Sequence, residues 1–181
     1  MLSASAANWG ATPDEVRRHQ PADDLLSTPA QHLDRAVTVR APAALTYRWL
    51  CQLSVAPYSY DLLDNFGRRS PDTLTEGADD LKPGQRLMAF DLTSVEPGHR
   101  FTWATSAKTE RMFGKLSCTY AVEPADDESC RLLCRLVVAQ SGPLGQVKAF
   151  LLGWGDLVMM RKQLLTLKKY AERDHAAAKQ S

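Results

Sequence analysis

A single long helix near the end of the chain constrains the fold more than any other feature of the sequence. Ser141 and Pro143 supply a helix cap and a first helical position, and the pattern continues to about Asp174, a length of ~45 Å. Its first half is apolar on nearly every side, whereas its second half sets Leu164 and Tyr170 against lysines and arginines. A helix that is apolar all round must be covered. The rest of the chain is therefore expected to supply a large apolar surface.

Strands with alternating apolar and polar residues predict that surface. The stretch HLDRAVTVRAP is expected to form the first strand, with Leu33, Arg35, Val37 and Val39 on one side. Later strands follow one another through short turns at EPGH and ADDES. Their shared faces are Met88, Phe90 and Leu92; Phe101 and Trp103; Leu116, Cys118, Tyr120 and Val122; Leu132, Cys134, Leu136 and Val138. We therefore expect an antiparallel sheet whose one apolar face is covered by the long helix.

Two short helices and a long loop are predicted between the first strand and these later strands. Pro42 begins a helix that runs through Leu53, and a second helix is expected from Ser59 to Gly67. The stretch from Gly67 to Gly84 is rich in turn residues and has no clear periodicity. A loop of this length within a compact domain is often functional, so we regard it as a candidate lid or pocket rim.

The N-terminal part contains a helix-start signature. Thr12 can cap the amide of Glu15 while Glu15 reaches back to Thr12, and Pro13 occupies the first helical position. Pro21 ends this helix, and we expect the segment, with Trp9 ahead of it, to pack on the outside of the main domain. The predicted organisation is an extension over residues 1–31, a domain over residues 32–176 and a disordered tail over residues 177–181.

The composition excludes several classes of function. The chain has 181 residues, 44% hydrophobic and 24% charged, and a net charge of +1, so it carries no field that would recruit nucleic acid. The most apolar window, Ala149 to Met160, is shorter than the ~20 residues of a membrane span. The first residues lack a basic and apolar leader. We expect a cytoplasmic protein with no stable membrane insertion.

No cofactor or metal is indicated. Cys130 and Cys134 have the wrong spacing for a zinc knuckle, and Cys51 and Cys118 stand alone, so all four are expected to be small buried hydrophobic residues. None of the four histidines lies beside an obvious nucleophile. No nucleotide-binding or metal-binding motif occurs.

The stretch VAPYSYDLLDN carries the main candidates for polar contact with a ligand. Tyr58 and Tyr60 either pack beneath the sheet edge while Asp61 caps its own helix, or they line a pocket mouth with Asp61. In the second case Asp61 or Tyr60 could act as an acid or base. Arg135 either points outward into solvent or binds Asp61 or a ligand carboxylate. Asp156 either caps the local backbone or forms an ion pair with Arg161 or with an arginine of the sheet, and it is ranked below Asp61 because an ion pair between helix and sheet explains it without a ligand.

The order of elements resembles the helix-grip fold of the START-like, or SRPBCC, superfamily, which includes polyketide cyclases and lipid-transfer domains. The stretches WGAT, YSYD…DN.GRRSP, EPG and GPLG…GD.VMMRKQL are similar to a bacterial branch of unassigned function. The resemblance implies an α+β fold in which a curved antiparallel sheet of about six or seven strands wraps around the long C-terminal helix, with two short helices after strand 1.

The resemblance also implies a hydrophobic cavity between the sheet and the long helix. By position, its walls would be Met88, Phe90, Phe101, Trp103, Leu116, Tyr120 and Leu136 on the sheet and Val147, Leu151, Trp154 and Val158 on the helix. Tyr58, Tyr60, Asp61 and Arg135 are the candidate polar contacts.

Three hypotheses follow. The first is binding of a small hydrophobic molecule, lipid-like, aromatic or polyketide-like, without a cofactor. The second is a polyketide-type cyclase or dehydratase that uses Tyr60 and Asp61, which we rank lower because the sequence lacks a histidine–aspartate pair. The third is a pocketless interaction domain. The oligomeric state, a homodimer included, stays open.

Overall fold

The computed structural model describes residues 7–26, 30–59, 69–87, 90–140 and 142–180. Within these ranges, residues 112–113 and 142–157 are described by their backbone alone. No helix in the described ranges has both the length and the apolar composition needed to cross a bilayer.

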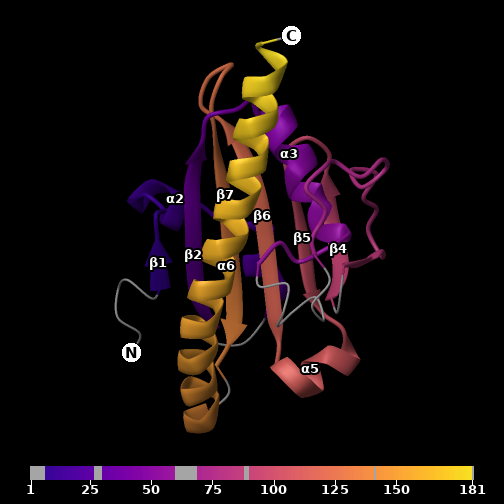
Figure 1. Cartoon of the computed structure of the whole chain (residues 1–181). Helices are drawn as coiled ribbons and strands as arrows, with labels where there is room; N and C mark the ends of the chain where they lie inside the picture. Colours follow the sequence, from indigo (N-terminus) through magenta and orange to yellow (C-terminus); the bar gives the residue numbers. More distant parts are fainter. Residues whose placement is uncertain (1–6, 27–29, 60–68, 88–89, 141, 181) are drawn as a thin grey trace.

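The architecture is a seven-stranded sheet with a long helix across one face (Figure 1). The strands are β1 (Asn8–Trp9), β2 (Ala30–Val39), β3 (Arg86–Leu87), β4 (Phe90–Glu96), β5 (Arg100–Thr105), β6 (Leu116–Pro124) and β7 (Cys130–Ala139). The helices are α2 (Pro13–Arg17), η1 (Pro21–Leu25), α3 (Ala43–Cys51), η2 (Gln52–Ser54), α5 (Ala107–Phe113) and α6 (Gly142–Ala178). The strand order is β1-β2-β7-β6-β5-β4-β3. Every pair is antiparallel except β1 with β2. The predicted α+β class and the long C-terminal helix are confirmed.

The local signals in the sequence explain most of these elements. The capping box at Thr12 is present, with Thr12 Oγ1 accepting from the Glu15 amide at 3.2 Å and Glu15 Oε2 accepting from the Thr12 amide at 2.7 Å. Gly98 turns β4 into β5 with φ +79°, a conformation that costs other residues more. In the ADDES turn, the Ala125 amide donates to Ser129 O at 3.0 Å.

Four features differ from the expectation. The strand predicted to carry Met88, Phe90 and Leu92 on one face is instead represented by two strands, β3 and β4, which pair antiparallel with Leu87 opposite Phe90. The short helix α5 was not predicted. The strand β1 was not predicted either, and a Cβ at Gly10, just after it, would collide with the carbonyl oxygen of Ala36. The last helix extends to Ala178, beyond the predicted end.

The stretch between β2 and β3 is described only in part. The predicted helix from residue 59 to residue 67 lies outside the described residues except for its first position. Residues 69–85 contain turns and no regular helix or strand, as predicted for the candidate lid.

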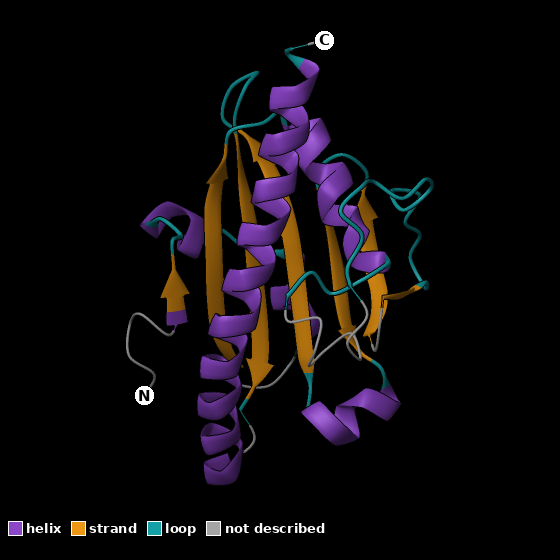
Figure 2. Cartoon of the chain, viewed as in Figure 1, coloured by secondary structure: helices purple, strands orange, loops and turns teal. Residues whose placement is uncertain are grey.

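The two faces of the sheet pack against different parts of the chain (Figure 2). On the inner face, α6 lies against β2, β7 and α3, and its residues Leu164, Leu167 and Ala171 are completely buried. On the outer face, η1 packs on β5, β6 and β7, where the Ala22 amide donates to Thr119 Oγ1 at 3.0 Å. The N-terminal segment therefore packs on the outer face of the sheet. Trp9 is an exception, because the Arg161 guanidinium of α6 lies 5.3 Å from its ring centroid.

Candidate ligand-binding site

Antiparallel pairing arranges the inner face of the sheet in cross-strand rows. One row, called here the middle row, contains Arg35, Cys134, Tyr120 and Phe101, from β2, β7, β6 and β5. The next row toward α5, the lower row, contains Leu33, Leu136, Cys118, Trp103 and Leu92. Because side chains alternate along a strand, all members of these rows point toward α6.

The end of the inner face away from α5 is packed solidly. Trp49 of α3 stacks on Tyr170 of α6, with ring centroids 4.9 Å apart, and Tyr58 meets Tyr170 edge-on at 6.2 Å. Trp49 Nε1 donates to Asp174 Oδ2 at 2.9 Å, which fixes α3 to α6. Val39, Val122 and Leu132 beneath this cluster have no exposed surface. The side chains that the structure describes at this end therefore pack closely between the sheet and α6.

The apolar residues near α5 are buried slightly less completely than those at the solid end. Trp103, Leu116 and Leu136 each retain 7% of their exposure, and Phe90 is half-buried. Phe90 and Trp103 stack with centroids 4.0 Å apart. Val37, at the solid end, is 9% exposed. It lies apart from the group near α5, whose members are on the neighbouring strands β4, β5, β6 and β7.

Two polar groups stand in the middle row, Tyr120 and Arg35. The Tyr120 hydroxyl donates to Gln163 Oε1 at 2.6 Å, and Gln163 Nε2 donates to Pro57 O at 2.6 Å, so this chain of bonds ties β6 to α6 and to the segment before residue 58. Arg35 is 1% exposed, and its Nη1 donates to Ala7 O at 3.1 Å and Asp34 O at 2.9 Å. A buried guanidinium is rare, and it favours carboxylate or other acceptor groups.

The cysteines behave as the sequence suggested. All four are buried and none forms a disulfide bond. The sulfur atoms of Cys118 and Cys134 lie 3.3 Å apart on the inner face. Burial raises the pKa of Cys51 to about 12 and also raises the pKa of Cys130. Among the described residues, no cluster of three or more His, Cys, Asp or Glu could hold a metal ion.

Comparison with solved structures identifies this architecture. A solution structure from Thermobifida fusca aligns with a TM-score of 0.51 and 16% identity, covering 77% of this chain and 94% of that one. A point mutant of norcoclaurine synthase from Thalictrum flavum, in complex with a transition-state analogue, aligns with a TM-score of 0.51 and 16% identity, covering 80% and 98%. The chain has the fold of these structures, the helix-grip fold expected from the sequence.

The di-domain ARO/CYC StfQ of the steffimycin pathway extends this comparison. It aligns with a TM-score of 0.52 and 11% identity over 81% of this chain and 52% of StfQ, so the chain spans about half of that protein. No protein-family model and no curated protein sequence matches the chain. At these identities the SRPBCC likeness concerns the fold, and function has to be argued from the site.

Within the helix-grip fold, five predicted wall residues lie on the inner face near or in the two rows: Phe101, Trp103, Leu116, Tyr120 and Leu136. Phe90 adjoins them through its stack on Trp103. Tyr60, Asp61 and Met88 lie outside the described residues, and for Val147, Leu151, Trp154 and Asp156 only the backbone of α6 is described.

The remaining predicted contacts fall elsewhere. Val158 is 51% exposed, so its side chain faces solvent instead of the sheet. Tyr58 is 1% exposed, has φ +54° and belongs to the solid end. Sequence reasoning did not single out Arg35. Its signal was visible, because the alternation of β2 places this charged residue among Leu33 and Val37 on the apolar side.

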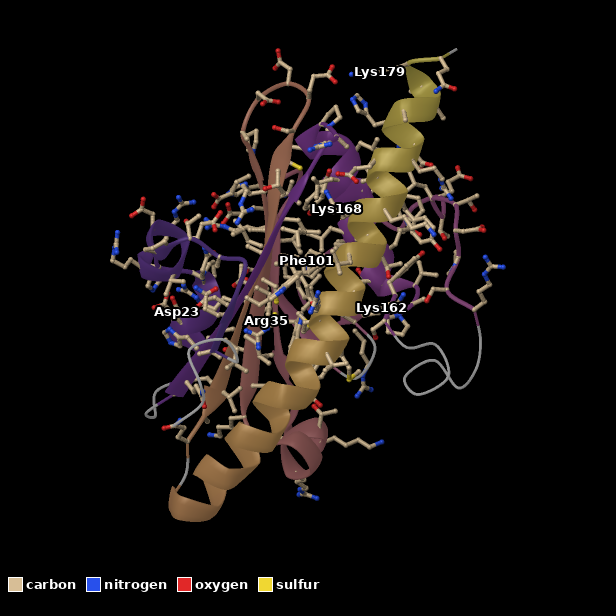
Figure 3. All side chains as sticks on the ribbon, turned by 60° about the vertical axis from the view of Figure 1, so that its left-hand side comes forward. Asp23, Arg35, Phe101, Lys162, Lys168 and Lys179 are labelled. Atoms are coloured by element: carbon tan, nitrogen blue, oxygen red, sulfur yellow. The ribbon has the colours of Figure 1, made fainter. Side chains whose placement is uncertain are left out.

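Arg135 lies on the outer face, away from the two rows, and is only 4% exposed (Figure 3 labels its partner Asp23 on that side). The expected solvated position is therefore wrong. Its guanidinium donates to Asp34 Oδ1 at 2.7 Å and to Asp23 Oδ2 at 3.0 Å, and to the carbonyl oxygens of Glu15, Val16 and Arg18. Burial raises the pKa of Asp34, and the bond from Arg135 offsets this only in part. These contacts hold the N-terminal helices on the sheet.

Proposed function

We propose that the chain binds a small hydrophobic molecule, lipid-like or aromatic, between the α5 end of the sheet and α6, without a dissociable cofactor. The observation that carries the proposal is the difference between the two ends of the inner face. The solid end is closed by the Trp49–Tyr170 stack, whereas Trp103, Leu116 and Leu136 retain surface at the other. Small-molecule sites are concave, mostly apolar, and contain a few polar groups that fix orientation.

The chemistry of the rows supports a ligand with a largely apolar body. The stacked Phe90 and Trp103 offer a flat aromatic surface, on which a ring or an alkyl chain can pack. Arg35 and Tyr120 stand in the adjacent middle row, and both have hydrogen-bond partners within the protein. The proposed site residues are therefore Phe90, Phe101, Trp103, Leu116, Tyr120, Leu136 and Arg35.

A neutral fluorescent probe tests the proposal. N-phenyl-1-naphthylamine carries no charge, so its binding reports apolar burial alone. We expect saturable binding by the unchanged chain, and an affinity about tenfold weaker in Leu136→Phe, because the larger ring occupies ligand space. Leu165→Phe, at a 39% exposed position of α6, is the matched control and should bind as the unchanged chain does. Competition by a long-chain alcohol or by a planar tricyclic phenol then distinguishes a lipid-like from an aromatic ligand.

The stability of the same variant separates a cavity from a filled core. Overpacking a filled core costs about 1–3 kcal/mol, so an unchanged free energy of unfolding in Leu136→Phe supports free space. If that variant does not fold, Leu116→Phe repeats the test from the neighbouring strand. Absence of saturable probe binding, or equal binding by the filled variants, overturns the proposal in favour of a pocketless interaction domain.

A reaction on the bound molecule is the second hypothesis. Norcoclaurine synthase and the ARO/CYC protein share the fold and are named for enzymatic activities. Tyr60 and Asp61 are the acid and base proposed from the sequence. Tyr60→Phe and Asp61→Asn should then abolish turnover while the probe affinity is preserved, and loss of binding in both would contradict this assignment.

A further inference from the structure

A second pocket lies at the surface of α6, apart from the proposed hydrophobic site. It has a volume of about 170 Å³ and is formed between α6 and the segments at residues 58–59 and 69–70. From α6 it is lined by Lys162, Thr166, Lys169 and Tyr170. Successive spacings of four and three residues place the first three on one side of a helix. We call this the basic groove.

The charge on the basic groove has one sign. Among the residues that the structure describes around the groove, Lys162, Lys169 and Arg69 line it and no carboxylate does. Arg69 forms an ion pair with Asp72, with Nη2 and Oδ2 3.6 Å apart. A chain with a net charge of +1 has no general excess of cations to account for this grouping.

The other basic residues described on α6 have a carboxylate or an aromatic ring as a partner. Lys168 is paired with Glu172, Arg173 with Asp174 and Lys179 with Glu128. Arg161 lies over the Trp9 ring instead. Among the side chains that the structure describes, Lys162 and Lys169 are the α6 cations with neither a carboxylate within 4.0 Å nor another element's aromatic ring beneath them. Both of them face the basic groove.

Hydroxyl and aromatic side chains form the remaining wall of the basic groove. Ser59 and Ser70 line it, with 9% and 7% exposure. Thr166 Oγ1 donates its proton to Lys162 O at 2.8 Å, so it offers no donor to an anion in the groove. Tyr58 and Tyr170 form the apolar base, and their contact with Trp49 separates the groove from the sheet.

We propose that the basic groove binds a phosphate group, either free, as a small phosphomonoester, or as a lipid headgroup. Ammonium groups act as point charges for phosphate, and a phosphate dianion matches the charge of two lysines better than a carboxylate does. The volume exceeds that of several waters at about 30 Å³ each, which is enough for a phosphate and its first substituent atoms. This inference does not depend on the proposed hydrophobic ligand, because the aromatic cluster lies between the two sites.

The test compares two double variants of the full chain. Lys162→Gln/Lys169→Gln removes the α6 cations of the groove, and Lys108→Gln/Lys115→Gln removes the same charge on and beside α5. All four positions are exposed, so both variants should fold. Calorimetry with inorganic phosphate and with phenyl phosphate, at constant ionic strength, measures the affinity.

We expect millimolar binding by the unchanged chain and by the α5 variant, and binding about tenfold weaker by the groove variant, since each exposed ion pair contributes roughly 1.4-fold to fivefold. Vesicles of phosphatidylcholine with and without phosphatidic acid form the second arm. Vesicle binding that the groove variant loses identifies a headgroup, whereas binding of phosphate alone identifies a free phosphate ligand. Equal responses of the two double variants, or no saturable response to any of these probes, overturn the inference.

Discussion

Arg135 offers the sharpest test of how the sheet is held together on its outer face. Its side chain makes five hydrogen bonds, two to carboxylates and three to the carbonyl oxygens of residues 15, 16 and 18. In Arg135→Met the apolar volume is largely kept, while every one of these bonds is lost. The Asp34 side chain, 9% exposed, then has no cation against it.

The expected cost follows from the burial of the partners. Removing one member of a buried ion pair costs about 3–5 kcal/mol, because the other charge is left uncompensated. An exposed pair contributes about 0.2–1 kcal/mol, and Arg100 with Glu96 is such a pair, with 29% and 51% exposure. We therefore expect Arg135→Met to lower the free energy of unfolding by about 3–5 kcal/mol and Arg100→Met by less than about 1 kcal/mol.

Urea unfolding measures the free energy of unfolding of both variants. Its dependence on pH is a second criterion. Burial already raises the pKa of Asp34 in the folded protein, and loss of Arg135 should raise it further. The folded state then holds a proton that the unfolded state releases, so the deficit of Arg135→Met is complete above the folded pKa. It should shrink as the pH falls through that value.

A double variant completes the argument. Arg135→Met/Asp34→Asn replaces the stranded carboxylate by a neutral amide, so it should recover part of the loss and remove the pH dependence. A single-variant loss below about 1 kcal/mol, or a deficit that does not change with pH, would refute the reasoning from burial.

Two further predictions concern other parts of the fold. Hydrogen bonds from Arg131 and from Thr12 outweigh burial and lower the pKa of Glu15 below its ordinary value of 4.5. Glu15 therefore stabilises the fold above that pH and loses this contribution as the pH falls through the lower folded pKa, so Glu15→Gln should flatten the acid limb of the unfolding profile; identical acid limbs would contradict it. Gln163→Leu should cost about 2–4 kcal/mol in urea unfolding, because the Tyr120 hydroxyl and Pro57 O both lose a buried partner. Met159→Leu, at a 39% exposed position on the same helix, should change stability by less than about 0.5 kcal/mol.

Features encoded in short stretches were predictable from the sequence. The alternation in residues 33–39 and 132–138 reflects a sheet with one buried face, and the capping box at Thr12 is a local hydrogen-bond pattern. Helix α5 was missed because seven residues carry too little periodicity. Its ends were nevertheless signalled, by Ser106 capping the Thr109 amide and by Gly114 with φ +83°.

Features that depend on distant pairing were not predictable. A two-residue strand such as β1 has no pattern of its own and exists because residues 8–9 lie beside β2. Arg135 was expected in solvent because its burial requires a segment more than a hundred residues earlier to fold over it. The burial of Arg35, by contrast, could have been predicted, since a charged residue at an apolar position of an alternating strand is itself evidence for a polar group in the core.

The two halves of the long helix correspond to the two ends of the sheet. The second half was predicted to be amphipathic, and its residues Leu164, Leu167 and Ala171 close the solid end. The first half, residues 142–157, is apolar on nearly all sides in sequence, and its backbone runs at the same end of the molecule as α5 (Figure 1). A helix of that composition needs apolar cover, and it is at this end that Trp103, Leu116 and Leu136 keep accessible surface. An apolar ligand satisfies both surfaces at once, which is why the filling of this end by Leu136→Phe is the experiment that decides between a binding protein and a closed core.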